Sequence, residues 1–296
     1  MNNTKISGFP GNNYWKPLIA VIVWGFSFIV TKYALEEVKP VTIVFLRQIL
    51  GIAFLGAIAV KQKKSFAIDR KNGFWVLLLG GLTSLHLWIQ ITGLQYTSAS
   101  NTGWIIGITP VFMILLSFFF FKEKMGTQQI AGIMVSFFGL LMLVGKGDFS
   151  KIDLIQNKGD ILVITSSFTW AVYSMISKRA TLNYSPLMVT FYLFLIMAVV
   201  MLPFNLGTKE IDSILSLSIK GWLSIAFLGI LCSGVGYYLW AQTLNEMSAS
   251  KAGAFLYVEP FVTFFSAALL LNEKFSAITL LSGIIIIIGV ILVNRK

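Results

Sequence analysis

Two ionisable side chains lie deep within apolar stretches of this sequence, and they are its main candidates for chemistry. Glu259 precedes Pro260 inside the apolar stretch 248–271. Arg47 lies about six residues, or roughly 9 Å of helix, into the stretch 41–60. A charge at that depth in hydrocarbon costs about 3 kcal/mol on insertion scales, so it persists mainly with a partner or in a wet cavity. Both residues therefore mark candidate functional positions.

Each of these charges has several possible uses. Glu259 can be protonated and hydrogen-bonded as part of the structure, can bind a cationic amine, or can titrate as a proton carrier. Arg47 can pair with Glu36 or Glu37, or can hold an anionic group of a ligand. The residues alone leave these uses open.

His86 and Gln90 form a further polar pair, four residues apart and therefore on one helix face. His86 has two interpretations, a hydrogen-bonded contact between helices and a proton carrier. The chain has one histidine and one cysteine, so we expect no metal site, no cofactor and no intrachain disulfide.

Aromatic and amide side chains supply the remaining polar atoms of the apolar stretches. Such a mixture suits an amphipathic metabolite, especially a zwitterion or an amine with an apolar side chain. Packing is the alternative for these aromatics, and we expect at most half of them to contact a ligand. The candidates for a cavity lining are Trp24, His86, Gln90, Trp104, Trp170, Tyr173, Tyr237, Tyr257 and Glu259, with Glu259 and His86 also candidates for proton coupling.

The elements that position these residues are membrane-spanning helices. Hydrophobic residues make up 56% of the chain, charged residues 12%, and the mean hydropathy is +0.81. A bilayer core needs roughly 20 apolar residues per helix. We predict an all-α integral membrane protein with ten transmembrane helices, at 15–35, 41–60, 73–93, 98–121, 127–144, 159–178, 186–204, 221–242, 248–271 and 278–293.

The chain also repeats itself. Leu94–Leu143 aligns with Leu244–Val293 at an offset of 150, and an offset of 146 aligns Trp24 with Trp170 and Lys32 with Lys178. The identical positions at the first offset are Leu94/Leu244, Ser98/Ser248, Ala99/Ala249, Ser100/Ser250, Gly103/Gly253, Pro110/Pro260, Glu123/Glu273, Lys124/Lys274 and Gly139/Gly289. We therefore predict two five-helix repeats, residues 1–146 and 147–296.

Five spans per repeat is an odd number, so the second repeat must be inverted relative to the first. Inverted repeats are a recurrent transporter architecture with the substrate site near the midplane. Pro110 and Pro260 each remove a backbone donor, so we expect helix kinks at matching positions beside that site. Glu123 and Glu273 stand beside lysines at helix ends, where they can latch one half against the other.

The net charge of +11 is explained by topology. With a cytoplasmic N-terminus, the cytoplasmic side would hold fourteen of the 23 basic residues and the opposite side seven, with Lys32 and Arg47 inside spans. Basic loops concentrate on the cytoplasmic side, so we place both termini there. No basic domain lies outside the spans, which argues against nucleic-acid binding.

These features resemble the EamA-type branch of the drug/metabolite transporter superfamily over nearly the whole chain. The resemblance rests on Pro110, on Glu259-Pro260, on the sequences FKEK (121–124) and LNEK (271–274), and on Phe45-Leu46-Arg47. It implies two inverted five-helix repeats and a member of a family that exports amino acids, other metabolites and drugs. The substrate is not specified by these motifs.

We therefore predict a secondary transporter of the cytoplasmic or inner membrane that exports small organic solutes by alternating access, as a monomer or homodimer in the lipid bilayer. Coupling is open between facilitated exchange and proton antiport. An importer, an anion or sugar-phosphate-type exchanger and a non-transporting membrane sensor remain alternatives. The chain has no Walker A loop, HExxH or GxSxG motif, which argues against an ATPase or an intramembrane enzyme.

Overall fold

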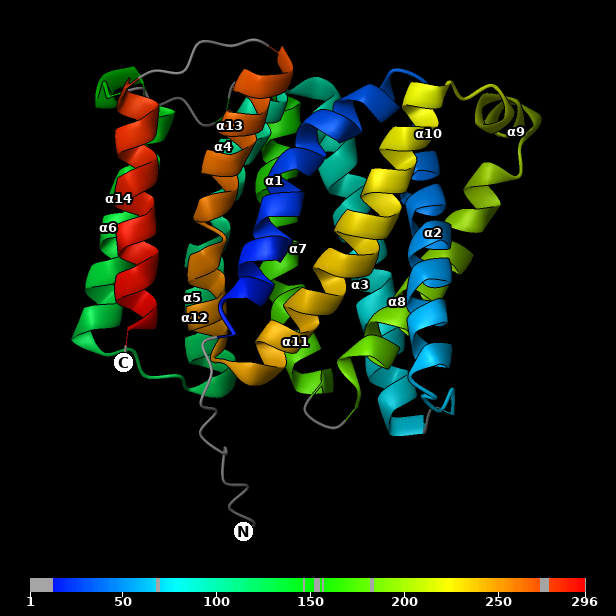
Figure 1. Ribbon diagram of the computed structural model, residues 1–296, viewed down its shortest axis with the longest axis horizontal. Coiled ribbons are helices and arrows are strands. Elements are labelled where there is room, and N and C mark those ends of the chain that lie inside the picture. Colours follow the sequence, from blue (N-terminus) through cyan, green and yellow to red (C-terminus); the bar gives the residue numbers. More distant parts are fainter. Residues whose placement is uncertain are drawn as a thin grey trace.

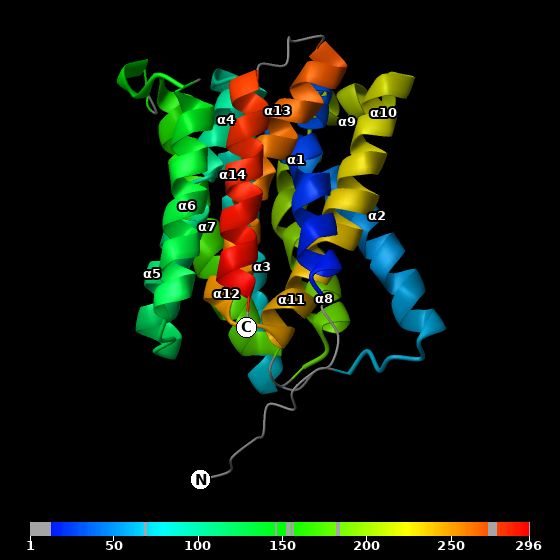
Figure 2. The ribbon, with the colours of Figure 1, turned by 60° about the vertical axis from the view of Figure 1, so that its left-hand side comes forward.

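The structure, a computed structural model, describes residues 13–67, 70–145, 147–151, 155, 157–181, 184–271 and 277–295. Every regular element within these ranges is helical (Figures 1 and 2). The chain starts α1 and finishes α14 at the same end of the molecule, the lower end in Figure 1. We call this the terminal end and the other the distal end.

The helices follow the apolar stretches closely. The first half contains α1 (Trp15–Leu35), α2 (Pro40–Lys61), α3 (Arg70–Tyr96), α4 (Ala99–Ile106), α5 (Thr109–Phe121) and α6 (Thr127–Val144). The second half, which follows the short helix η1 (Phe149–Lys151), contains α7 (Lys158–Thr181), α8 (Pro186–Met201), η2 (Leu202–Asn205), α9 (Thr208–Leu215), α10 (Ile219–Ala226), η3 (Phe227–Tyr237), α11 (Tyr238–Glu246), α12 (Ala249–Phe255), α13 (Val258–Leu271) and α14 (Ala277–Asn294).

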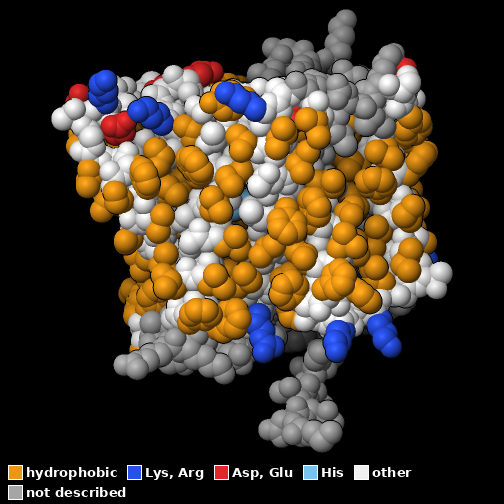
Figure 3. Space-filling view, turned by 180° about the vertical axis from the view of Figure 1, so that it is seen from behind, with side chains coloured by type: hydrophobic (Ala, Val, Ile, Leu, Met, Phe, Trp, Pro, Cys, Tyr) orange, Lys and Arg blue, Asp and Glu red, His pale blue; other side chains and the backbone are white. Residues whose placement is uncertain are grey.

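Eight helical stretches among the described residues are long and apolar enough to cross a bilayer. They are Trp15–Leu35, Pro40–Lys61, Gly73–Tyr96, Ala99–Phe121, Thr127–Val144, Lys158–Thr181, Pro186–Asn205 and Ile219–Glu246. The other two stretches predicted to span contain α12 with α13, and α14. Figure 3 shows the corresponding surface, a band of hydrophobic side chains with Lys and Arg at its two ends. The protein is a multi-pass membrane protein.

Two local features differ from the sequence prediction. The connection predicted between 204 and 221 contains α9, whose residues are not buried and which exposes Ile211 and Leu215. The helix over 219–246 widens into a π-helical segment at η3. Within η3, Gly229 and Gly234 pack against Leu50 and Phe54 of α2 with no room for a side chain.

The two halves pack against each other through reciprocal contacts. Helix α4 packs on α13 and α5 on α12, while α6 packs on α14. A Cβ atom on Gly103 would lie 2.8 Å from Thr263 Cβ, and one on Gly253 would lie 3.2 Å from Met113 Cβ. These pairs exchange under the 150-residue offset, since 103 corresponds to 253 and 113 to 263. Figure 1 shows α4 and α13 in the distal half and α5 and α12 in the terminal half.

Helices α6 and α14 meet through glycines at the same offset. A Cβ on Gly139 would lie 2.9 Å from Ile286 Cγ1, and a Cβ on Gly289 would lie 2.5 Å from Ser136 N. Ser136 Oγ also donates to Ile286 O at 3.2 Å. Without a hydrophobic drive between helices in lipid, such close backbone packing is what holds this pair together.

We predict that Gly289→Ala separates α6 from α14, because the added methyl group would overlap backbone atoms of α6. Overpacking typically costs about 1–3 kcal/mol. A thermal unfolding measurement in detergent should show a clear fall in melting temperature. Gly81→Ala is the matched control, since a Cβ there meets nothing within 4 Å. Equal melting temperatures for the two variants would contradict this packing.

The distal end carries a carboxylate with a lowered pKa. Ser218 Oγ and Ser218 N donate to Glu37 at 2.6 and 2.7 Å. These bonds, aided by the charge of Lys220, hold the pKa of the Glu37 carboxyl below its usual range. Glu36 makes only an exposed ion pair with Lys220, at 3.3 Å.

We predict that Glu37→Gln lowers the melting temperature at neutral pH, and that its difference from wild type disappears in acid. A carboxyl group whose pKa is lower in the folded protein than in the unfolded chain stabilises the fold at any pH above its unfolded pKa of about 4.3. That stabilisation is lost as the pH falls through the folded pKa. Melting curves between neutral and acidic pH test this, with Glu36→Gln as control because exposed pairs contribute little. A difference that persisted at low pH would rule the explanation out.

Candidate substrate cavity

Two interrupted helices meet at mid-depth. Helices α4 and α5 are separated at Gly107 and Ile108, and α12 and α13 at Leu256 and Tyr257. The chain tightens at both interruptions, with Gly107 N donating to Trp104 O and Leu256 N to Gly253 O, each at 3.0 Å. Pro110 and Pro260 follow within one turn, near the start of the second helix of each pair. Interrupted helices leave backbone polar groups unpaired at membrane depth, where such groups line cavities.

A cavity of about 40 Å³ lies beside the two interruptions. A single water needs about 10–15 Å³ by this measure, so the cavity holds roughly three waters and no larger solute. Its lining consists of Trp24, Ser27, Phe28, Arg47, His86, Leu87, Gln90, Ile106, Thr109, Ser167, Trp170, Tyr237, Leu256 and Glu259.

Much of this lining comes in pairs related by the repeat. Trp24 and Trp170 correspond at the 146-residue offset, and their rings pack edge to face with centroids 4.9 Å apart. Two further pairs in the lining correspond at the 150-residue offset, namely Ile106/Leu256 and Thr109/Glu259. Corresponding positions of the two repeats therefore line one cavity.

Aromatic rings close one side of the cavity. The ring centroid of Tyr237 lies 5.2 Å from that of Trp170 and 5.8 Å from that of Trp24. The centroids of Tyr173 and Trp170 are 4.8 Å apart, and those of Trp240 and Trp24 are 5.6 Å apart. The indole Nε1 of Trp24 donates to Cys232 O at 3.0 Å, which fixes its ring. This aromatic cluster, Trp24, Trp170, Tyr173, Tyr237 and Trp240, is a rigid wall with few exposed atoms.

Arg47 is 4% exposed, and its Nε donates to Ser233 Oγ of η3 at 2.9 Å. The carboxylates predicted as its possible partners bind elsewhere, Glu36 to Lys220 and Glu37 to Ser218. The geometry therefore excludes that pairing. No carboxylate of the described residues lies within ion-pair distance of the Arg47 guanidinium, whose remaining N–H groups are available to a ligand.

Glu259 is 5% exposed and lines the same cavity from α13. Its side chain makes no hydrogen bond or ion pair with any residue that the structure describes. Two hydroxyl groups of the lining, Thr109 Oγ1 and Tyr237 OH, are buried and also lack a hydrogen-bond partner there. Buried polar atoms without partners are costly and mark places where a ligand or water binds.

His86 contacts α7 as well as the cavity. Its Nδ1 lies 3.0 Å from Ser166 O and 3.1 Å from Thr169 Oγ1. A carbonyl can only accept, so Nδ1 carries the proton and neutral His86 has Nε2 as its acceptor. Gln90, one turn along α3, lines the cavity beside it.

Three candidates from the sequence do not line the cavity. Trp104 stacks on Phe264 with centroids 5.8 Å apart, Tyr173 lies behind Trp170, and Tyr257 is fully buried next to Glu259. The sequence offered no way to distinguish these aromatics, because ring type does not reveal which helix face is inward. Glu273 and Lys274 lie outside the described residues.

Seven lining residues were missed by the sequence analysis, and some were recoverable. Thr109 is the repeat equivalent of Glu259, and Ser27 is three residues after Trp24 on one helix face. Phe28, Leu87, Ile106 and Leu256 are apolar and carry no signal distinct from core packing, and Ser167 has no polar equivalent at the 146-residue offset.

Comparison with known proteins now decides the family. The sequence profile described as the EamA-like transporter family matches residues 15–145 and again residues 157–295. The chain belongs to the EamA-like transporter family. A relative from Archaeoglobus fulgidus, named an uncharacterized transporter, is 30% identical over 282 residues, which cover 94% of this chain and 96% of that protein.

Other relatives of this EamA-like transporter extend the comparison. A probable amino-acid metabolite efflux pump of Escherichia coli K12 is 27% identical over 291 residues, covering 92% of this chain and 91% of the pump. A solved crystal structure superposes with a TM-score of 0.77 at 18% identity, over 96% of this chain and 98% of that one, and supports the fold.

We predict that the cavity admits water-soluble reagents when the transporter opens, whereas Cys232 does not react. Cys232, the one cysteine of the sequence, is 0% exposed and packs against Val23 O. In a Gln90→Cys variant, a small methanethiosulfonate should modify residue 90 much faster than Cys232, as followed by mass spectrometry. Equal rates at the two positions would show that the cavity is a dry packing defect.

Proposed function

We propose that this EamA-like transporter is a secondary transporter that exports zwitterionic amino acids and related amines across the cytoplasmic membrane. The architecture behind this proposal is ten spans in two inverted five-helix repeats, 1–146 and 147–296. The two separate matches of the family profile and the reciprocal Gly103–Thr263 and Gly253–Met113 contacts support it. The excess of basic residues at the terminal end supports a cytoplasmic location for both termini.

One observation carries the substrate class. A buried guanidinium from the first half and a buried carboxylate from the second half line one cavity, and neither has an ionic partner among the described residues. A cation and an anion on opposite halves match the carboxylate and ammonium groups of an amino acid. The name of the Escherichia coli relative, an amino-acid metabolite efflux pump, points the same way.

The walls between the two charges suit an apolar or aromatic side chain. Trp24, Trp170 and Phe28 provide rings, and Ile106 and Leu256 provide aliphatic surface. A ring face also attracts an ammonium group, which adds to the binding of the amine. The hydroxyls of Thr109 and Tyr237 supply hydrogen bonds to the polar end of the substrate.

The small cavity supports an alternating mechanism. A volume of about 40 Å³ does not hold an amino acid, so binding requires the halves to part around the helix interruptions. Two similar halves in opposite orientation can open the same site first to one side and then to the other.

Glu259 also supplies a route to proton coupling. Its carboxylate can bind either a proton or the substrate ammonium group, so the two compete for one site. Release of the amino acid outside with uptake of a proton, followed by proton release inside, gives antiport. Both partners then use the same residue in turn.

We predict that purified protein in proteoliposomes accumulates aromatic or aliphatic amino acids when a pH gradient is imposed. Amino acids, amines and nucleosides form the test panel. Arg47→Gln should weaken uptake of amino acids far more than uptake of the corresponding amines, because an amine has no carboxylate for Arg47 to bind. Losing a charge-assisted hydrogen bond costs about 1.5–3 kcal/mol, or roughly 10- to 100-fold in affinity.

Glu259→Gln tests the coupling separately. This variant should retain exchange down a concentration gradient, with lowered affinity, and should lose accumulation driven by the pH gradient. Glu36→Gln, at an exposed ion pair on the distal end, is the control. Full gradient-driven accumulation by Glu259→Gln would eliminate the coupling role.

A further inference from the structure

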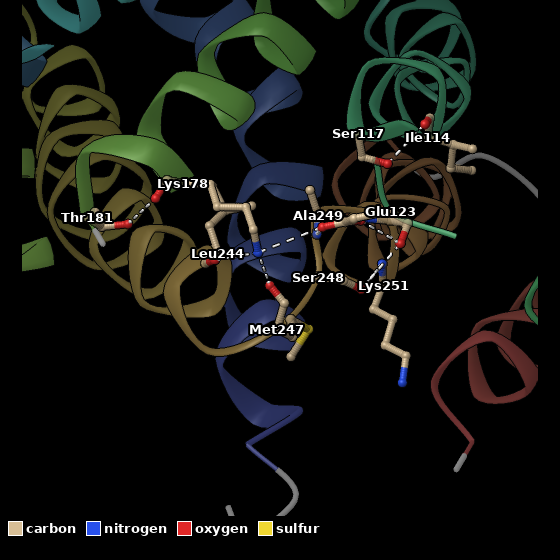
Figure 4. Close-up of polar contacts among 11 residues, drawn as sticks. Ile114, Ser117, Glu123, Lys178, Thr181, Leu244, Met247, Ser248, Ala249 and Lys251 are labelled. Atoms are coloured by element: carbon tan, nitrogen blue, oxygen red, sulfur yellow. Dashed lines mark hydrogen bonds and ion pairs between the residues drawn. The ribbon is translucent and has the colours of Figure 1, made fainter. Parts of the chain in front are cut away.

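A network of hydrogen bonds and one ion pair surrounds the turn between α11 and α12 at the terminal end (Figure 4). We call Met247 and Ser248 the α11–α12 turn, since α11 ends at Glu246 and α12 begins at Ala249. Side chains of α7 and of the segment after α5 reach this turn from two directions. The network therefore joins elements of both halves of the chain.

Glu123 binds the start of α12. Lys122 adopts a left-handed conformation with φ of 51°, which turns the chain sharply after α5 and directs Glu123 towards the second half. The Glu123 carboxylate accepts hydrogen bonds from Ala249 N at 3.0 Å, Ser250 N at 3.1 Å and Ser250 Oγ at 3.0 Å. A carboxylate is favoured at this position by the positive end of the helix dipole.

Lys178 binds the end of α11. Its Nζ donates to Leu244 O at 3.2 Å and to Met247 O at 2.5 Å. An ammonium group satisfies the last carbonyls of a helix and complements the negative end of its dipole. Lys178 therefore does more than snorkel to the membrane surface, because it ties α7 to α11.

The two charges also contact each other. Lys178 Nζ lies 3.9 Å from Glu123 Oε1, with both side chains about one-seventh exposed. The negative residue thus caps the helix that starts at the turn, and the positive residue caps the helix that ends there. Charged groups of opposite sign therefore bind the backbone on either side of the two-residue turn between α11 and α12.

Every element held by this network also reaches the cavity. Helix α5 begins at Thr109 and α7 carries Ser167 and Trp170, all in the cavity lining. Helix α11 follows Tyr237 directly, and α12 ends one residue before Leu256. Opening the cavity towards the terminal end requires these elements to separate, and the network holds them together.

The repeat equivalents of Glu123 and Lys178 are Glu273, which lies outside the described residues, and Lys32. Lys32 corresponds to Lys178 at the 146-residue offset, yet its Nζ makes no hydrogen bond or ion pair with any residue in the described ranges. Among the described residues, the contact of a lysine with a turn between helices is therefore made at the terminal end.

We propose that Glu123 and Lys178 form a latch that closes the cytoplasmic path to the cavity and releases during transport. The proposal rests on the alternating transport cycle proposed above and assigns residues to one of its gates. Release is reversible because the partly exposed side chains of Glu123 and Lys178 can exchange their hydrogen bonds for bonds to cytoplasmic water. The latch therefore biases a two-state equilibrium without trapping it.

The test measures access to the cavity from the cytoplasmic side. The reporter is Gln90→Cys in a Cys232→Ser background, labelled in inside-out vesicles with a membrane-impermeant thiol reagent. Glu123→Gln places an amide among backbone donors and removes the ion pair, and Lys178→Met removes the cation. Each should raise the labelling rate about tenfold. Unchanged rates in both variants would overturn the latch.

Glu37→Gln is the matched control. Glu37 accepts from the backbone and hydroxyl of Ser218 as Glu123 does from Ser250, but at the distal end. It should leave cytoplasmic labelling unchanged, and an equal rise would show a general loosening instead of a latch. Folding is checked in the same variants with native Cys232, which should stay unreactive.

A covalent version tests the latch in the opposite sense. In Glu123→Cys/Ser250→Cys with Gln90 retained, in the Cys232→Ser background, a short bifunctional thiosulfonate should block flux, and reductant should restore it. Full flux after complete cross-linking would contradict the proposal. Labelling needs no substrate, so a latch that behaves as expected in a protein without amino-acid flux would reject the substrate assignment alone.

Discussion

The constraint on which the structure depends is the burial of two ionisable side chains, Arg47 and Glu259, in one apolar interior. Each would cost about 3 kcal/mol or more in hydrocarbon, and they do not neutralise each other by direct contact. The fold must therefore provide polar surroundings at mid-depth. It does so by interrupting two helices, by placing Ser233 against Arg47 and by leaving a small cavity with polar lining between the halves.

The same constraint explains the close packing around the cavity. A polar cavity in a membrane protein has to be sealed from lipid, and sealing requires helices that approach closely. Gly103 and Gly253 allow this at the interrupted helices, and Gly139 and Gly289 allow it between α6 and α14. The aromatic cluster closes one side of the cavity with few exposed atoms, and the Glu123–Lys178 network joins α7, α11 and α12 at the terminal end.

The sequence predicted a helical membrane protein built from two repeats, and its repeat also placed part of the cavity lining. Internal correspondence places Trp24 beside Trp170 and Thr109 opposite Glu259, because equivalent residues near a symmetry axis must meet. The structure brings these residues into one lining. In-span charge was equally informative, since Arg47 and Glu259 have few places to lie other than a cavity.

Other features could not be predicted from one sequence. The direction of an aromatic side chain depends on helix rotation, which near-uniform hydrophobicity leaves undetermined, and Trp104 and Tyr257 therefore could not be separated from Trp24. The π-helical segment at 227–237 depends on the contacts of Gly229 and Gly234 with α2, which are tertiary. The contact of Arg47 with Ser233 of η3 could not be predicted for the same reason, because it joins two segments far apart in the sequence.

The central claim is that one cavity recognises both charges of a zwitterion. Isothermal titration calorimetry on the purified protein with phenylalanine, its methyl ester and N-acetylphenylalanine tests it directly, since each derivative lacks one charge. The account predicts that both derivatives bind at least about tenfold more weakly than phenylalanine, the cost of one charge-assisted hydrogen bond. Equal affinities for the three ligands would contradict it.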